Sequence, residues 1–178
     1  MNKMLIAAAT ATGLLCASQS VLAEGDTYIG AQYNMYTVST SGADDLEPDG
    51  LALILGGKLN DNFMIEGRFG RSLSDDNIPG VALKVDEQIG FYVKGGMEFA
   101  NMVFPYVALG YTKVDFETRD PIDDTAYGLP YGTESDLSYG VGADLHFGNL
   151  QVGIEWMMLQ DKTDYELEGL SLSGAWRF

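Results

Sequence analysis

The chain has 178 residues, which is the size of a single domain. It contains 26 acidic and 10 basic residues, for a net charge of −16 at pH 7. Such an excess of acid leaves little basic surface for a phosphate backbone, so the composition argues against a nucleic-acid partner.

The N-terminus has the three parts of a secretory signal. Lys3 supplies the positive start, residues 4–15 form an apolar run without a charge, and residues 21–23 fit the small-x-small pattern of a cleavage site. The run is shorter than the roughly 20 residues that a membrane-spanning helix needs. We therefore expect residues 1–23 to be removed and residues 24–178 to form the exported domain. That domain keeps all 26 acidic residues against nine basic ones, because only Lys3 is lost.

Beyond the expected signal, apolar residues alternate with polar or small residues, which indicates strands with two different faces. In the first strand, Ile29 and Tyr33 fall on one face, and Gln32 and Asn34 on the other. Glycine and aromatic residues are frequent throughout. We predict eight strands, at residues 27–38, 50–59, 63–71, 85–98, 103–114, 137–147, 150–159 and 169–178.

The predicted connections alternate between short and long. The short ones are residues 60–62, 99–102 and 148–149, and the long ones are residues 39–49, 72–84, 115–136 and 160–168. This alternation is typical of barrels that cross an outer membrane. The sequence therefore predicts an all-β fold, namely an eight-stranded antiparallel transmembrane β-barrel with short periplasmic turns and longer acidic extracellular loops. Outward aromatic residues predict two interfacial girdles, one at Phe63, Phe147, Trp176 and Phe178 and the other at Phe69, Tyr111 and Tyr139.

Three segments resemble a known family. Residues 105–111 (PYVALGY) and 138–143 (SYGVGA) look like the fifth and sixth strands of small outer-membrane barrels, and residues 174–178 (GAWRF) resemble their last strand. The chain thus resembles the porin-like superfamily that includes the outer-membrane protein A barrel and the opacity proteins. The resemblance implies a Gram-negative outer-membrane location, and recognition of Trp176 and Phe178 by the barrel-assembly machinery. It implies little about activity, since members include structural proteins, adhesins and serum-resistance factors.

Eight charged residues fall on inward positions of the predicted strands. The bases are Lys58, Arg68, Lys94 and Arg177, and the acids are Glu66, Glu98, Asp144 and Glu155. A buried charge without a partner costs several kcal/mol, and an eight-stranded barrel is only just wide enough for its side chains. We therefore predict a salt-bridge network that plugs the lumen. A charged ring around a small pore is the alternative.

The sequence offers little for catalysis. His146 is the only histidine, and its position beside the turn at Gly148 favours a hydrogen bond within the lumen over a catalytic role. The only cysteine, Cys16, lies in the expected signal, and the chain contains no glycine-rich phosphate loop or zinc motif. We therefore expect neither an enzyme nor a cofactor.

The excess acid falls in the predicted loops. The first loop contains Asp44, Asp45, Glu47 and Asp49, and the third contains or adjoins Asp115, Glu117, Asp120, Asp123, Asp124, Glu134 and Asp136. Solvated loops are the favoured interpretation, and a Ca²⁺ site is the alternative, because the oxygen ligands are present without a recognised spacing. These acids should repel lipopolysaccharide phosphates unless divalent ions bridge the two.

The third loop also contains apolar residues, namely Tyr127, Leu129, Pro130 and Tyr131. Exposed aromatic side chains can anchor a partner, although packing among the loops also explains them. The leading hypothesis is a non-enzymatic surface barrel that acts in envelope structure or in adhesion to a surface or host ligand. Its other partners would be outer-membrane lipid, lipopolysaccharide and the assembly machinery. The alternative is a small channel for ions or solutes.

Overall fold

The computed structural model describes residues 27–40, 45–73, 76–78, 81–100, 102–119, 132–163 and 165–178. The expected signal at residues 1–23 and the apolar residues of the third loop, Tyr127, Leu129, Pro130 and Tyr131, lie outside the described residues. No described helix is long and apolar enough to cross a membrane. The described elements are β1 (Thr27–Thr40), β2 (Asp49–Lys58), β3 (Phe63–Ser72), β4 (Asp76–Ile78), β5 (Val81–Gly96), β6 (Val103–Arg119), β7 (Gly132–Phe147), β8 (Leu150–Asp161) and β9 (Tyr165–Arg177).

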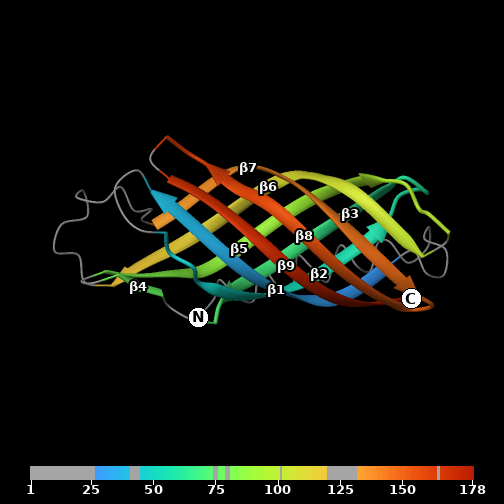
Figure 1. Cartoon of the computed structure of the whole chain (residues 1–178), viewed down its shortest axis with the longest axis horizontal. Coiled ribbons are helices and arrows are strands. Elements are labelled where there is room, and N and C mark those ends of the chain that lie inside the picture. Colours follow the sequence, from blue (N-terminus) through green and yellow to red (C-terminus); the bar gives the residue numbers. More distant parts are fainter. Residues whose placement is uncertain are drawn as a thin grey trace, which may run out of the picture.

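The strands form one antiparallel sheet that closes on itself. Its order is β3-β2-β1-β9-β8-β7-β6-β5-β4, and an additional β3–β5 pairing closes the ring. β4 pairs with β5 through three residues only and adds a small hairpin to one end of the barrel. The other eight strands make the wall, so the predicted eight-stranded antiparallel barrel is confirmed. Figure 1 shows these strands strongly tilted to the long axis, as closure of a small barrel requires.

Three tight connections set the register of the wall. They are residues 59–62, 97–102 and 148–149. All three lie at the end of the barrel that contains Phe178. We call this end the turn end and the opposite end the loop end. Hairpins closed at these turns predict that Lys58 lies opposite Met64 and that Gly142 lies opposite Glu155, and the structure has both pairs. A slip of one residue would exchange the inner and outer faces, so these registers decide which side chains enter the lumen.

The strands reach further toward the loop end than the sequence predicted. β6 continues to Arg119 and β7 begins at Gly132, so Asp115, Glu134 and Asp136 belong to strands and not to a loop. The prediction of one long link at residues 72–84 was also wrong, because β4 and the start of β5 pair there. The sequence analysis ended the strands too early because it took these acidic residues for loop residues. Asp115 lies on the outer face of β6, whereas Glu134 and Asp136 share the inward parity of Ser138 on β7, and Asp136 pairs with Lys162 (3.4 Å).

The outer face carries an apolar belt between two sets of aromatic residues. The exposed residues of the belt include Leu53, Ile89, Val107, Leu109, Val141, Ile154 and Leu172. All seven aromatic residues of the predicted girdles are exposed. On the loop-end side of the belt, the indole N–H of Trp156 donates to the Glu168 carboxylate (3.1 Å), so an aromatic side chain is hydrogen-bonded to a charged residue there. An apolar band flanked by amphipathic rings is the surface that a membrane-spanning barrel presents to lipid.

Candidate functional site

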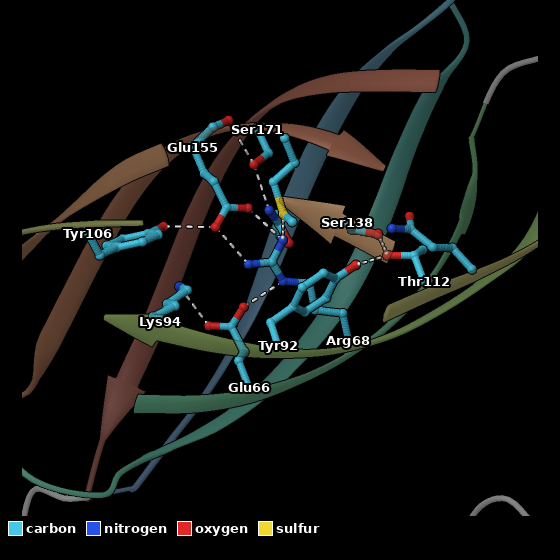
Figure 2. A network of polar contacts seen from close by, with 12 residues as sticks. Glu66, Arg68, Tyr92, Lys94, Tyr106, Thr112, Ser138, Glu155 and Ser171 are labelled. Carbon is cyan, nitrogen blue, oxygen red and sulfur yellow. Dashed lines mark hydrogen bonds and ion pairs between the residues drawn. The ribbon is translucent and has the colours of Figure 1, made fainter. Parts of the chain in front are cut away.

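The middle of the lumen contains a compact group of ionisable side chains. We call Glu66 and Arg68 (β3), Lys94 (β5), Asp144 (β7) and Glu155 (β8) the central charge cluster. All five are at most 5 % exposed. Arg68 donates to Glu155 through two nitrogens (2.5 and 2.9 Å) and to Glu66 through Nε (2.5 Å). A bidentate Arg–carboxylate pair is among the strongest polar contacts in proteins, so Arg68 bridges opposite walls of the barrel (Figure 2).

Lys94 extends this cluster toward the turn end. Its Nζ lies 2.8 Å from Glu66 and 3.6 Å from Asp144, and it sits 4.5 Å from the centre of the Tyr106 ring. Tyr106 itself donates to Glu155 (3.0 Å). One ammonium therefore serves two carboxylates and an aromatic face, which limits the desolvation cost of each group.

Tyrosines complete the central layer, and sequence reasoning did not assign them this role. Tyr28 donates to Glu66 (2.7 Å), and the ring of Tyr92 lies 4.3 Å from the Arg68 guanidinium carbon. The Tyr92 hydroxyl is 2.6 Å from Thr112, whose hydroxyl is 2.6 Å from Ser138. Tyr92 shares its strand parity with the inward Lys94, and Ser138 shares its strand parity with the inward Asp144. That parity was the signal that could have identified them.

Glycines provide the space for these large side chains. A Cβ at Gly110 would lie 2.3 Å from the Tyr92 ring, and one at Gly142 would lie 2.6 Å from the Tyr106 ring. Each glycine lies on the strand next to its tyrosine. Large and small residues thus alternate across the lumen, which lets a narrow barrel fill without clashes.

A second charged group lies at the turn end. Lys58 Nζ is 3.1 Å from Asp61 and 4.0 Å from Glu98, and His146 Nδ1 is 3.3 Å from Glu98. Glu98 follows the end of β5 at Gly96, so it lies in a turn and is more exposed than the strand predicted for residues 85–98 implied. Among the described residues, Glu98 is thus the acidic residue that contacts both His146 and Lys58.

The remaining predicted site residues lie at the end of β9. Arg177 is half-buried, its backbone N–H donates to Asn149 O, and Asn149 Nδ2 donates back to Arg177 O (both 2.8 Å). These bonds attach the last strand to the β7–β8 turn. Trp176 and Phe178 point outward into the aromatic girdle of the turn end. Their role as an assembly signal stays a prediction.

Sequence reasoning missed a buried apolar group at the loop end. We call it the apolar cap; its members are buried, and they are Tyr36, Val38, Leu46, Val114, Phe116, Leu159, Tyr165 and Leu167. Val38 lies opposite both Leu167 and Leu46, and Phe116 meets Tyr165 edge to face with ring centroids 6.0 Å apart. The cap explains why the strands continue past the belt, since the added inward positions include the buried Val114, Phe116 and Leu167.

The family of the chain follows from a match along most of its length. The family model of the outer membrane protein beta-barrel domain matches residues 7–178. The chain belongs to this family of outer-membrane barrels. It is therefore a protein of the Gram-negative outer membrane, and its apolar belt is the surface in contact with lipid.

Solved structures of small barrels share this architecture. Ail, the attachment invasion locus protein of Yersinia pestis, is 18% identical with a TM-score of 0.61, over 88% of this chain and 100% of that one. Neisserial surface protein A is 14% identical with a TM-score of 0.62, over 85% and 97% of the two chains. A de novo designed transmembrane β-barrel is 13% identical with a TM-score of 0.52, over 88% and 98%. At these identities the likeness concerns the fold. No curated protein sequence matches the chain.

The charged side chains in the described interior are held in ion pairs between strands. Among the described residues, no three or more His, Cys, Asp or Glu side chains are grouped so that they could hold a metal ion. Within the same residues, each base of the central charge cluster is paired with two carboxylates. These pairs connect β3, β5, β7 and β8 across the lumen and can hold the walls of the barrel together.

Proposed function

We propose that this protein is a non-enzymatic outer-membrane barrel with a closed lumen, which acts in envelope structure or in surface contact through its loop end. The observation that carries the proposal is the position of Arg68. Its guanidinium is bound to carboxylates from β3 and β8 in the middle of the lumen, with less than 5 % of its side chain exposed. An ion crossing the barrel would have to displace this side chain from both carboxylates.

A second barrier supports the closed lumen. The apolar cap lies between the central charge cluster and the loop end, and Val38, Val114 and Leu167 in it are fully buried. Dry apolar constrictions oppose the passage of ions because an ion would have to shed its water there. Two barriers of different chemistry therefore lie in series along the barrel axis.

The surface charge limits the class of partner at the loop end. The Yersinia pestis Ail structure was determined in complex with the heparin analogue sucrose octasulfate, which is a polyanion. The present chain has a net charge of −16, and Asp161, Glu166 and Glu168 lie around the β8–β9 connection. We propose that its surface partner is neutral or basic, and that it approaches lipopolysaccharide phosphates only with divalent ions between them. Recognition of Phe178 by the assembly machinery is part of the same proposal.

A small channel is the second candidate function. Several buried polar atoms near the turn end lack a hydrogen-bond partner among the described residues, including Gln151 Oε1 and His146 Nε2. Buried polar atoms of this kind commonly bind water, so water entering from the turn end would reach part of the lumen. A channel would require this water-filled path to continue through the central charge cluster and the apolar cap.

A loop variant separates surface contact from conduction. Replacing Tyr127, Leu129, Pro130 and Tyr131 together by serine keeps the loop length and charge, and it removes the proposed anchor. We expect adhesion of cells displaying the variant to fall at least about tenfold, because aromatic anchors commonly carry 1–2 kcal/mol or more of binding energy.

The matched control changes charge in the same loop. Asp123→Asn with Asp124→Asn should retain adhesion, and both variants should retain the heat-dependent mobility shift of a folded barrel on a gel. If the serine variant adhered as well as the wild type, the third loop would not be the site of surface contact, and the channel would be favoured.

A further inference from the structure

The turn between β5 and β6 differs in composition from the other tight connections of the barrel. Residues 60–62 are Asn-Asp-Asn and residues 148–149 are Gly-Asn, which are ordinary turn residues. Residues 97–102, at the same end of the barrel as the C-terminus (Figure 1), are Met-Glu-Phe-Ala-Asn-Met. We call the three large apolar side chains of this turn the apolar foot. All three are exposed, and they are Met97, Phe99 and Met102.

The foot continues the outward row of side chains on β5. Because side chains alternate along a strand, Met97 and Phe99 share the parity of the exposed Ile89 and Val93. A bridge between Phe99 and Val103 carries the antiparallel pairing past the last residue of β5. The outward positions from residue 89 to residue 99 are Ile, Phe, Val, Gly, Met and Phe. The apolar belt therefore runs into the turn without a charged position.

The only charged residue of the turn, Glu98, is directed to the lumen. Its carboxylate lies 3.3 Å from His146 Nδ1 and 4.0 Å from Lys58 Nζ. Glu98 also has the opposite strand parity to its two neighbours in the foot. The outward side of the turn is thus apolar, although the turn contains an acid.

Backbone hydrogen bonds hold the turn to the strands on both sides. Gly96 N–H donates to Asn62 O (2.8 Å), and Asn62 Nδ2 donates to Gly96 O (3.0 Å). On the other side, His146 N–H donates to Met102 O (2.7 Å), and Met102 N–H donates to Phe99 O (3.0 Å). A backbone fixed in this way presents the foot outward and does not let it fold back over the lumen.

We propose that the apolar foot lies in the membrane leaflet at the turn end, where lipid covers its three side chains. Continuity with the belt identifies the occupant, because the belt is the surface of this outer-membrane barrel in contact with lipid. An exposed apolar patch that adjoins such a surface is covered by the same lipid, at the boundary between headgroups and acyl chains. The foot therefore anchors the β5–β6 hairpin in the membrane, while the polar turns at residues 60–62 and 148–149 face water.

Spin labels on single cysteines test where the foot lies. In a Cys16→Ser chain, which contains no other cysteine, Phe99→Cys is compared with Val107→Cys in the belt and with Asp61→Cys in the polar turn. The Asp61 side chain is 96% exposed, so its label is the aqueous control. Each protein is folded into vesicles of phosphatidylethanolamine and phosphatidylglycerol. We expect the ratio of oxygen to nickel-chelate accessibility at Phe99 to approach the ratio at Val107 and to exceed that at Asp61 several-fold.

Two results would overturn the inference. A Phe99 label as accessible to the water-soluble nickel chelate as the Asp61 label would place the foot in water. A label shielded from both reagents would indicate that protein covers the foot instead of lipid. Spin–spin broadening that disappears on dilution with unlabelled protein would identify that protein as a second copy of the chain.

Serine substitutions measure what the foot contributes to anchoring. Met97→Ser with Met102→Ser should lower the urea midpoint of the barrel in the same vesicles, because the lipid contact of two apolar side chains is lost. Leu73→Ser is the matched control and should lower the midpoint less, since the exposed Leu73 lies beyond the charged Arg71 at the loop end. An unchanged midpoint in the double variant would contradict the anchor. Conductance does not enter either readout, so the foot and the closed lumen are tested separately.

Discussion

Replacing Arg68 by methionine is expected to lower the free energy of unfolding by about 3–5 kcal/mol, the usual cost of breaking a buried ion pair from one side. The substitution removes the cation paired with Glu155 and one of the two cations paired with Glu66, and both carboxylates remain almost fully buried. Urea unfolding in micelles, followed by the fluorescence of the two tryptophans, measures the loss.

The loss in free energy of unfolding should come from the two unpaired carboxylates and not from the lost packing of the arginine side chain. Adding Glu66→Gln and Glu155→Gln to Arg68→Met should recover much of the stability, since neutral amides need no counter-charge. Arg71→Met on the same strand is the matched control. Arg71 is 61% exposed and lies 3.9 Å from Asp86, so its removal should change the stability by less than about 1 kcal/mol. Equal effects at Arg68 and Arg71 would contradict a buried network.

Replacing Gly110 by valine is expected to lower the free energy of unfolding by about 1–3 kcal/mol, as overpacking of a filled interior commonly does. A Cβ at Gly110 would lie 2.3 Å from the Tyr92 ring and 2.4 Å from the Phe91 carbonyl oxygen. The Tyr92 ring would have to move, and it would lose its contact with Arg68 and its hydrogen bond to Thr112.

The matched control for crowding is the same substitution on the outer face. A Cβ at Gly174 meets nothing within 4 Å, so Gly174→Val should be neutral or slightly stabilising because valine favours strands. Unfolding in urea compares the two variants directly. A stable Gly110→Val barrel with an unchanged urea midpoint would show that the lumen has spare room, which the plug does not allow.

Most of the wall could be predicted from the sequence because membrane strands repeat with a period of two. The tight turns fixed the hairpin registers, so pairs such as Lys94 with Ala108 and Gly142 with Glu155 followed without a structure. The parity of each strand then put Glu66 and Arg68 inside. Local pattern and turn geometry carry this information, and neither depends on distant contacts.

The loop end and the exact charge pairings could not be predicted in the same way. Acidic residues such as Asp115 and Asp136 resemble loop residues in the sequence, although their strands continue because Val114 and Phe116 fill the interior beside them. Likewise, Lys58 is closest to Asp61, a turn residue that strand parity does not place. These details depend on which side chains meet across the lumen, and spacing along one strand does not contain that information.

Conductance across a planar lipid bilayer is the measurement that tests the closed lumen most directly. Purified protein should be folded in detergent, its folded band checked by the mobility shift on boiling, and single insertions recorded at neutral pH. The central charge cluster and the apolar cap together predict no steady conductance above that of the bare bilayer. A steady ohmic current from folded wild-type protein would contradict the plug and support the small channel in its place.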